Sequence, residues 1–409
     1  MSYERKIIND PVFGFINIPK GLLYDLVCHP LLQRLTRIRQ LGLSSVVYPG
    51  AQHTRFQHSL GAYYLMTEAI QHLTAKGNFI FDSEAEAVKA AILMHDIGHG
   101  PFSHVLEDTI VRGVSHEDIS LLLMERINHE MNGQLTLAIQ IFKDEYPKRF
   151  LHQLVSGQLD MDRLDYLRRD SFYTGVTEGN IGSARIIKML DVKDDHLVVE
   201  EKGIYSIENF LMARRLMYWQ VYLHKASVAY ERMLIAALLR AKELAAKGTE
   251  VFASPALRFF LYNDINRDIF YSRPECLENF IQLDDNDIWT ALKVWSDHPD
   301  KVLSTLSTGM VDRRLFKVEI STEHATEERK QELTAQIAAA LDVTPAEAAW
   351  FVSVPRIEKN MYNPADDSID ILYKDGTTKN IAEASDMLNI QLLSKKVKKY
   401  YLCYIRAHK

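Results

Sequence analysis

The chain has 409 residues, of which 47% are hydrophobic and 25% are charged, the composition of an ordinary globular protein. Its 48 Lys and Arg and 54 Asp and Glu give a net charge of −6, which argues against broad charge-driven binding to nucleic acid. The three cysteines are widely spaced, the start lacks the apolar run of a signal peptide, and no stretch approaches the roughly 20 apolar residues of a membrane span, so we expect a cytoplasmic protein.

The first half of the chain is predicted to be mostly helical. Residues 7–20 contain two prolines and a glycine and indicate a short hairpin or an extended arm. From about residue 22 apolar residues recur three and four apart, and a further helix begins near residue 55. Another spans residues 83–97 and ends in a turn rich in glycine and proline. More helices are expected at roughly 116–130, 134–145, 147–155 and 160–172.

The second half is predicted to end in a different kind of structure. Residues 196–205 are typical of a small hairpin with a turn near Lys202 and Gly203, and a long helical stretch follows over about 207–246. Helices continue to about residue 308, whereas the tail alternates apolar residues around an Asp-Gly turn and ends strand-like. We expect a mostly α fold: a helical body over residues 1–325, with a metal-site core at about 22–240 and an extension at about 241–325, followed by a small α+β appendage over 326–409.

The segment from Met94 to His104, MHDIGHGPFSH, concentrates groups with metal-binding and acid–base chemistry. A helix that ends in His95 and Asp96 places an imidazole and a carboxylate beside an apolar run, where an unpaired charge is costly. For the dipeptide alone, an ion pair at the helix end is a sufficient explanation, and a divalent metal is the other partner that fits. His99 follows four residues after His95, and the glycines then turn the chain so that the last histidine returns toward the same point. This density favours a site over core packing.

Two distant segments carry matching residues. The segment TRFQHSLG places Arg55 and His58 three positions apart on one helical face. The segment LDMDRLDYLRRD places Asp162, Tyr166 and Asp170 four positions apart, which makes one stripe along a helix.

A histidine, an adjacent His-Asp pair and an aspartate spread over three helices resemble the metal site of the HD superfamily. The segments RFQHSLG, HDIGHGPFSH and DMDRLDYLRRD resemble its deoxynucleoside-triphosphate (dNTP) triphosphohydrolase branch, which includes the mammalian SAM-and-HD-domain enzyme and bacterial relatives. The resemblance runs from about residue 10 to 320. It implies a helical fold with one divalent metal ion (Mg, Mn, Fe, Ni, Co or Zn) in a pocket, and hydrolysis of dNTPs to deoxynucleoside and inorganic triphosphate by metal-activated water. The implied ligands are His58, His95, Asp96 and Asp162.

The resemblance also implies roles for residues around the metal. His104 would protonate the leaving oxygen or position the attack, supported by His99, Glu107 and His116, although a structural hydrogen bond is the alternative for these three. A triphosphate carries several negative charges, so the pocket must supply cations, and Arg55 is expected to hold the α-phosphate. The other positions that match the substrate pocket are Gln40 and Asp170 for the sugar hydroxyl, Tyr222 for the sugar ring, and Arg163, Tyr166, Arg214 and Lys225.

Regulated members of the family bind an activating guanine nucleotide at a subunit interface. Arg313 and Lys317 match its phosphate-binding positions, whereas Cys28 and Thr36 stand where those members have an acid and a base that read guanine. The resemblance therefore implies an effector phosphate site without guanine selectivity, a nucleotide substrate and a homo-oligomer. Leu223 replaces a polar base-side residue of the mammalian enzyme and leaves the base preference open.

Two other functions fit the same residues. An HD phosphohydrolase with this site could act on another nucleotide phosphoester, such as a nucleoside monophosphate, a cyclic nucleotide or an alarmone. The GYP segment that accompanies cyclic-dinucleotide HD enzymes is absent from the sequence, which counts against that version. A nucleotide-binding regulator with vestigial activity is the alternative from another class, and the complete ligand set argues against it.

Overall fold

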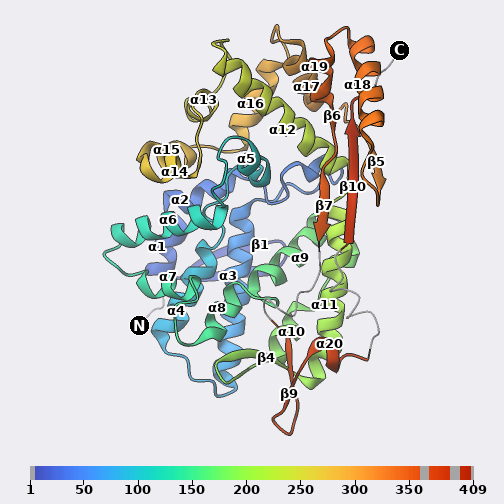
Figure 1. Cartoon of the computed structure of the whole chain (residues 1–409). Coiled ribbons are helices and arrows are strands. Elements are labelled where there is room, and N and C mark those ends of the chain that lie inside the picture. The colour runs from blue at the N-terminus through green and yellow to red at the C-terminus, as the bar shows by residue number, and fades with distance from the viewer. Residues whose placement is uncertain (1–4, 360–367, 387–396, 407–409) are drawn as a thin grey trace.

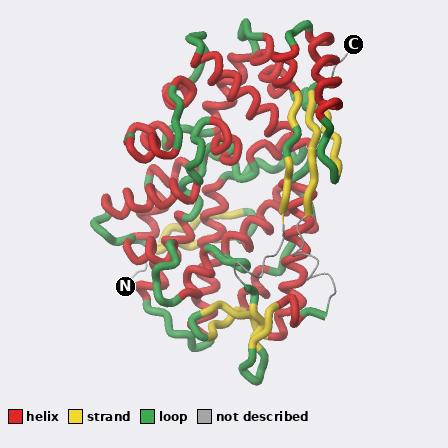
Figure 2. Tube along the Cα trace, viewed as in Figure 1, coloured by secondary structure: helices red, strands yellow, loops and turns green. Residues whose placement is uncertain are grey.

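The computed structural model describes residues 5–359, 368–386 and 397–406, and helices dominate this part of the chain (Figures 1 and 2). The mostly α fold with small sheets near both ends and within the body confirms the expected fold class. None of the helices in these ranges is long and apolar enough to cross a membrane.

An N-terminal hairpin opens the fold, as expected. β1 (Arg5–Asp10) pairs antiparallel with β2 (Gly14–Pro19), and the side chains of Ile16 and Ile18 are fully buried. The hairpin therefore contributes to the core instead of extending as a free arm. The helices that follow are α1 (Leu22–Cys28), α2 (Pro30–Gln33), η1 (Arg34–Arg37), η2 (Gly42–Val46), α3 (Arg55–Ala75), α4 (Asp82–Met94), α5 (Ser103–Thr109), α6 (His116–Glu130), α7 (Thr136–Phe142), α8 (Arg149–Val155), α9 (Met161–Thr174), η3 (Thr177–Gly179) and α10 (Ser183–Met189).

Helices α3, α4 and α9 form the centre of the body, with α3 packed against both others. Helix α3 begins with a capping box, because the Gln57 side chain accepts a hydrogen bond from the Thr54 backbone N–H at 2.8 Å. In α9 the Asp160 side chain caps the first turn, and Gly175 ends the helix in the left-handed region. These local signals fix where each helix starts, and thereby which residues occupy the first turns of α3 and α9.

The hairpin expected over 196–205 is present, but the predicted position of its turn is wrong. The strands are β3 (Leu190–Lys193) and β4 (His196–Glu200), and the turn lies at Asp194 and Asp195, with φ of 51° and 60°. Aspartate tolerates this left-handed conformation better than most residues. Gly203 instead lies in the 3₁₀ helix η4 (Glu201–Gly203), where a Cβ atom would be 2.6 Å from Val199. That glycine serves close packing and not the turn.

The expected long helix over 207–246 is interrupted. It consists of α11 (Ile204–Met217), the π-helical turn η5 (Tyr218–Tyr222) and α12 (Lys225–Ala246). Other elements hold the turn: Tyr48 donates its hydroxyl to the Gln220 carbonyl at 2.6 Å, and Tyr401 donates to the Leu223 carbonyl at 3.1 Å. The extension continues with α13 (Pro255–Tyr262), α14 (Arg267–Ser272), α15 (Pro274–Phe280), α16 (Asp285–Trp295), α17 (Lys301–Val311) and β5 (Lys317–Ser321).

The C-terminal strands complete sheets that begin in the body. β10 (Val397–Tyr404) pairs antiparallel with β5 (Figure 1). β8 (Asp370–Leu372) pairs parallel with β4. The division near residue 325 stays a prediction about domain organisation, but strand pairings join the two parts at both places. The remaining elements are α18 (Glu327–Leu341), α19 (Pro345–Ala348), η6 (Ala349–Phe351), β6 (Val352–Ser353), β7 (Arg356–Lys359), β9 (Thr378–Asn380) and α20 (Ile381–Ala384).

The three cysteines differ in accessibility, which gives a first prediction. Cys28 is exposed, whereas Cys276 and Cys403 are fully buried, and burial raises the pKa of the Cys403 thiol to about 12. Because the thiolate is the reactive form, an aromatic disulfide reagent should modify only Cys28 rapidly in the folded protein. The reaction is followed by absorbance, with the same protein in denaturant as the control in which all three react. Rapid modification of all three in the folded protein would contradict the burial.

Candidate metal centre

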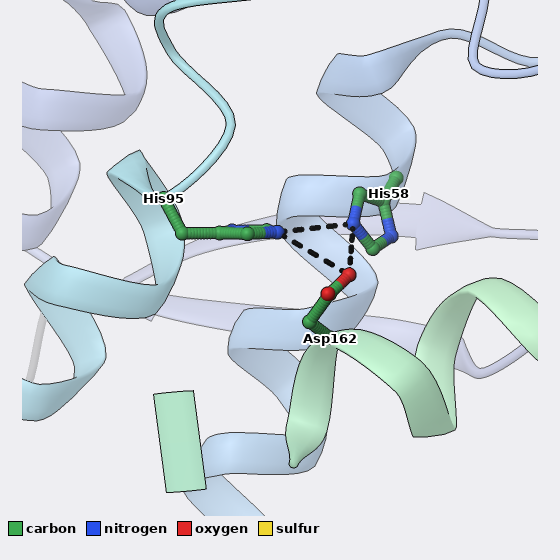
Figure 3. Close-up of side chains that lie close together, drawn as sticks. All are labelled: His58, His95 and Asp162. Atoms are coloured by element: carbon green, nitrogen blue, oxygen red, sulfur yellow. Dashed lines mark hydrogen bonds and ion pairs between the residues drawn. The ribbon is translucent and has the colours of Figure 1, made fainter. Parts of the chain in front are cut away.

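Three side chains from different elements meet at one point. His58 lies in the first turn of α3, His95 follows directly after α4, and Asp162 lies in the first turn of α9. Each offers one ligand atom, and these atoms all lie within 4.8 Å of one another. His58 Nε2 is 3.0 Å from Asp162 Oδ1 and 3.2 Å from His95 Nε2 (Figure 3).

The hydrogen bonds behind the two imidazoles decide which nitrogen faces this point. His58 Nδ1 lies 2.6 Å from Asp165 Oδ2, and His95 Nδ1 lies 2.6 Å from the Ile92 carbonyl oxygen. Carboxylates and carbonyls only accept, so both Nδ1 atoms carry hydrogen. In the neutral rings both Nε2 lone pairs then face each other and an Asp162 oxygen. This arrangement is repulsive by itself and is stabilised by a divalent cation, so the residues fit a metal ion.

The pKa values of these groups show the strong negative field at this point. Burial lowers the pKa of His58, but the hydrogen bonds to Asp162 and Asp165 outweigh it and raise the pKa to about 10. Burial raises the pKa of Asp162, but the hydrogen bonds to His58 and His95 hold it far below its ordinary value. The site therefore attracts positive charge, which a metal ion would supply.

Asp96 lies at the edge of this cluster. Its Oδ1 is 3.5 Å from His95 Nε2, and its Oδ2 is 3.8 Å from His58 Nε2. The same carboxylate accepts from Arg55 at 2.6 Å and contacts His99 Nε2 at 3.2 Å. Burial raises the pKa of Asp96, but the charges of His99, His95 and Arg55 outweigh it and hold the pKa well below its ordinary value. Asp96 is an ionised carboxylate facing the cluster, and its role as fourth ligand stays a prediction.

Three of the four expected acid–base residues are in contact with one another. The rings of His99 and His116 stack, with centroids 3.9 Å apart and planes 17° apart. His116 Nδ1 lies 2.9 Å from Glu107 Oε1. Burial lowers the pKa of His99 to about 3. The fourth residue, His104, begins helix α5 with Ser103, but its side chain lies outside the described residues.

The expected sugar-binding residues form a hydrogen-bonded group beside the metal cluster. Tyr222 donates its hydroxyl to Asp170 Oδ2 at 2.8 Å, and His53 Nε2 lies 2.7 Å from Asp170 Oδ1. The Tyr222 ring lies edge-on to Tyr166 at 6.0 Å, and Tyr166 lies edge-on to His58 at 6.5 Å. Tyr166 thus lies between Tyr222 and His58.

Cationic side chains around the cluster keep hydrogen-bonding capacity free. Arg55, Arg163 and Arg214 each bury an Nε atom that has no hydrogen-bond partner among the described residues. The Oε1 atom of Gln40, an acceptor, is also buried without a partner among the described residues. Burying a polar atom without a partner is costly, so the guanidinium groups suit a ligand with anionic oxygens, and the Gln40 oxygen suits a ligand donor such as a hydroxyl.

Lys225 lines a cavity that none of the other expected substrate residues lines. Together with Arg313 and Lys317 it lines a cavity of about 860 Å³. Arg314 and Arg406 also line it, and no acidic residue of the described chain does. The structure thus brings both expected effector residues together with one expected substrate residue.

Sequence reasoning missed residues that support the site from behind. Asp165 was visible in the stripe segment, three positions after Asp162, and the pair Asp165 and Arg169 has the i, i+4 spacing of a helical ion pair. Nothing in the sequence linked Asp10 to Arg169 or His53 to Asp170, because those contacts join elements far apart in the chain.

A His residue, a His-Asp pair and an Asp residue on three packed helices define the HD class of metal-dependent phosphohydrolases, and the chain belongs to this family. Residues 55–168 match the model of the HD domain, and residues 181–254 match that of the HD associated region. A crystal structure of a phosphohydrolase from Bacteroides thetaiotaomicron is 83% identical, with a TM-score of 0.96, and the match covers 98% of this chain and 100% of that chain. YwfO of Bacillus subtilis is 34% identical over 321 residues, which are 77% of this chain and 72% of the relative.

Relatives with named activities confirm the resemblance to the dNTP triphosphohydrolase branch. The deoxynucleoside triphosphate triphosphohydrolase SAMHD1 homolog of Dictyostelium discoideum is 30% identical over 259 residues, and SAMHD1 of Bos taurus is 28% identical over 283 residues. These matches cover 59% and 58% of this chain. The chain spans about half the length of these two relatives, at 50% and 48%.

Proposed function

We propose that the protein hydrolyses deoxynucleoside triphosphates to deoxynucleosides and inorganic triphosphate. The observation that carries the proposal is a set of three arginines, Arg55, Arg163 and Arg214, whose Nε atoms are buried without a partner among the described residues. A chain of phosphates supplies the anionic oxygens that such guanidinium groups bind. The similarity to proteins named as dNTP triphosphohydrolases supports the same substrate class.

The cluster of His58, His95 and Asp162, joined by Asp96, would hold one divalent metal ion. When bound, the ion supplies Lewis acidity that activates water and polarises a phosphoryl oxygen. Imidazole and carboxylate ligands suit Mn, Fe, Ni, Co and Zn, and also Mg when water completes its shell.

Side chains of the protein would bind the reacting phosphate and protonate the leaving oxygen. Arg55 ties Asp96 in place through Nη1 and offers its Nε to the α-phosphate. We assign protonation of the leaving oxygen to His104, by resemblance. Glu107 holds a proton on His116 Nδ1, and the stacked His99 keeps Asp96 oriented.

Four residues would bind the nucleoside: Gln40, Tyr166, Asp170 and Tyr222. Asp170 has one oxygen bonded by Tyr222, and each of its oxygens can accept a further hydrogen bond from a sugar hydroxyl. Gln40 would donate from its amide NH₂ group to the oxygen of the same hydroxyl, and the rings of Tyr222 and Tyr166 would pack against the sugar.

Substitution of Arg55 by lysine tests the phosphate contact. Lysine keeps the charge but lacks the planar fork that can hold Asp96 through Nη1 and a phosphate oxygen through Nε, so kcat/KM should fall by about 10²-fold. Steady-state kinetics of triphosphate release measure the change. Arg112→Lys is the control, because Arg112 forms an exposed pair with Asp264. Full activity of Arg55→Lys would remove Arg55 from the phosphate site.

The C-terminal strand should influence nucleoside binding through Tyr401. This residue is 1% exposed, and its hydroxyl holds the carbonyl that ends the turn carrying Tyr222. Tyr401→Phe should raise KM about fivefold, the effect of one hydrogen bond, with little change in kcat. Tyr404→Phe is the matched control on the same strand, since Tyr404 donates to Glu319 instead. Equal KM values for both variants and the wild type would contradict the prediction.

A product assay tests the proposed reaction. The protein is incubated with each dNTP and NTP in the presence of Mg, Mn, Co or Ni, singly and in mixtures, and the products are separated by ion-exchange chromatography. Nucleoside and triphosphate in equal amounts, lost in Asp96→Ala and Asp162→Ala, support the proposal. Orthophosphate or a linear dinucleotide would indicate another phosphoester substrate. Tight dNTP binding without turnover, unchanged by substitution of His104, would indicate a nucleotide-binding regulator.

We also propose that the cavity around Arg313, Lys317 and Lys225 binds the phosphates of a nucleotide effector. Five basic and no acidic side chains among the residues lining it suit a polyanion. Light scattering with and without nucleotide tests the expected homo-oligomer. Arg313→Ala should abolish any stimulation of dNTP hydrolysis by a second nucleotide while unstimulated activity persists. Stimulation that survives in this variant would exclude the cavity.

A further inference from the structure

A chain of buried charged groups runs from the N-terminal hairpin to a metal ligand. Asp165 Oδ2 lies 2.6 Å from His58 Nδ1. Arg169 donates to Asp165 through Nε and Nη2 at 3.0 Å each, and to Asp10 Oδ2 through Nη1 at 2.8 Å. The side chains of His58, Asp165 and Arg169 are 0% exposed, and that of Asp10 is 4% exposed.

We propose that Asp10, Arg169 and Asp165 are positioning residues that fix His58 in the one neutral form able to bind the metal. The proposal rests on the metal centre but not on the identity of the substrate. The N-terminal hairpin would then contribute to metal binding through Asp10, at the end of β1.

The hydrogen bonds around Asp165 exclude the other neutral tautomer of His58, in which Nε2 carries the hydrogen. Both oxygens of Asp165 receive N–H groups of Arg169, so neither can carry a hydrogen, and the carboxylate only accepts. His58 Nδ1 must therefore donate, and the lone pair of the neutral ring lies on Nε2, the atom that faces Asp162 and His95. The carboxylate also makes the imidazole a stronger ligand.

Asp10 keeps Arg169 from turning away. Its Oδ1 accepts hydrogen bonds from the backbone N–H groups of Val12 and Phe13 at 3.0 and 2.9 Å, so the tight hairpin turn fixes the carboxylate. The ring of Phe13 lies 5.6 Å from the Arg169 guanidinium. With two carboxylates and one guanidinium, the chain of three positioning residues carries one net negative charge, which favours a cation at His58.

Replacing Asp165 by asparagine should remove this control over His58. The Asp165 oxygen that faces His58 Nδ1 also accepts from Arg169 Nε, and the other oxygen accepts from Arg169 Nη2, each at 3.0 Å. An amide has one oxygen and one NH₂ group, so in either orientation its NH₂ group faces a donor of Arg169. His58 then loses the carboxylate that orients its ring and strengthens it as a ligand. Asparagine preserves the volume of the side chain.

Calorimetric titration of metal-stripped protein with Mn²⁺, without nucleotide, tests the proposal. We expect Asp165→Asn to weaken Mn²⁺ binding by about 10- to 100-fold and Asp10→Asn by several-fold, with circular dichroism unchanged. The matched control is Asp300→Asn, because Asp300 pairs with Arg240 in the helical extension.

Wild-type Mn²⁺ affinity in folded Asp165→Asn would overturn the proposal. If that variant does not fold, wild-type Mn²⁺ affinity in folded Asp10→Asn would overturn the proposal instead. An equal loss of affinity in the control Asp300→Asn would also overturn it. A wild-type protein that binds no divalent ion would overturn the proposal together with the metal centre. A wild type that binds Mn²⁺ but hydrolyses no dNTP would refute only the proposed function.

Discussion

Replacing Asp162 by alanine is expected to lower the rate of hydrolysis by on the order of 10³-fold or more. The substitution removes the carboxylate nearest to both imidazoles, with Oδ1 3.0 Å from His58 Nε2 and 3.4 Å from His95 Nε2, so a bound metal would lose an anionic ligand. Asp96 remains near both imidazoles, but it lies farther away, at 3.5 and 3.8 Å, and is also bonded by Arg55. The measurement is triphosphate or phosphate release under single-turnover conditions, combined with metal content by mass spectrometry.

Asp264→Ala is the matched control for this substitution. Asp264 is an exposed carboxylate that pairs with Arg112 and Lys242 on the surface, where ion pairs contribute little to stability. Activity in Asp162→Ala within tenfold of the wild type, at full metal content, would show that the cluster is not the reactive centre.

Gly98→Ala should destabilise the fold by about 3 kcal/mol or more, because the added methyl group has no space. A Cβ atom at this position would lie 2.2 Å from both the His116 carbonyl oxygen and the Ser120 backbone nitrogen. These are backbone atoms of the first turn of α6 and cannot move aside singly. The Gly98 N–H also donates to Ser120 Oγ at 2.9 Å, which in turn donates to the His95 carbonyl oxygen. Overpacking here should therefore displace His95 as well.

Urea unfolding of the variant measures this loss, with Mn²⁺ affinity as the second readout. Gly182→Ala is the control, because the nearest atom to its Cβ would be 3.8 Å away and its φ is ordinary. A change in unfolding free energy for Gly98→Ala as small as that of the control would contradict the packing argument.

The helical part of the fold follows from local signals. Helix α6 begins at His116 and ends at Glu130, as its apolar spacing predicted, because Ser115 caps it by accepting from the Asp118 N–H. Helix α4 stops at Met94, three residues earlier than predicted, since Ile97 and His99 form turn-like hydrogen bonds to Met94 and Asp96. Propensity and capping act within a few residues and are therefore visible in the sequence.

Tertiary contacts decide what the sequence could not indicate. The π-helical turn over 218–222 interrupts a pattern that is helical throughout, and hydroxyl groups of Tyr48 and Tyr401 hold it from distant elements. The same holds for the site. The motifs identified His58, His95 and Asp162, whereas the supporting carboxylates were not separable from other acidic residues on helix surfaces.

The closing of the sheets by the last strands has a consequence for how the chain is made. The contact between Tyr401 and Leu223 spans 178 residues, and β8 must find β4 across a similar distance. During synthesis the helices that carry the metal ligands leave the ribosome long before these strands do, and contacts between remote segments form slowly. The body is therefore synthesised with the edges of β4 and β5 uncovered, and Tyr401 can hold the turn over 218–222 only after β10 has been made.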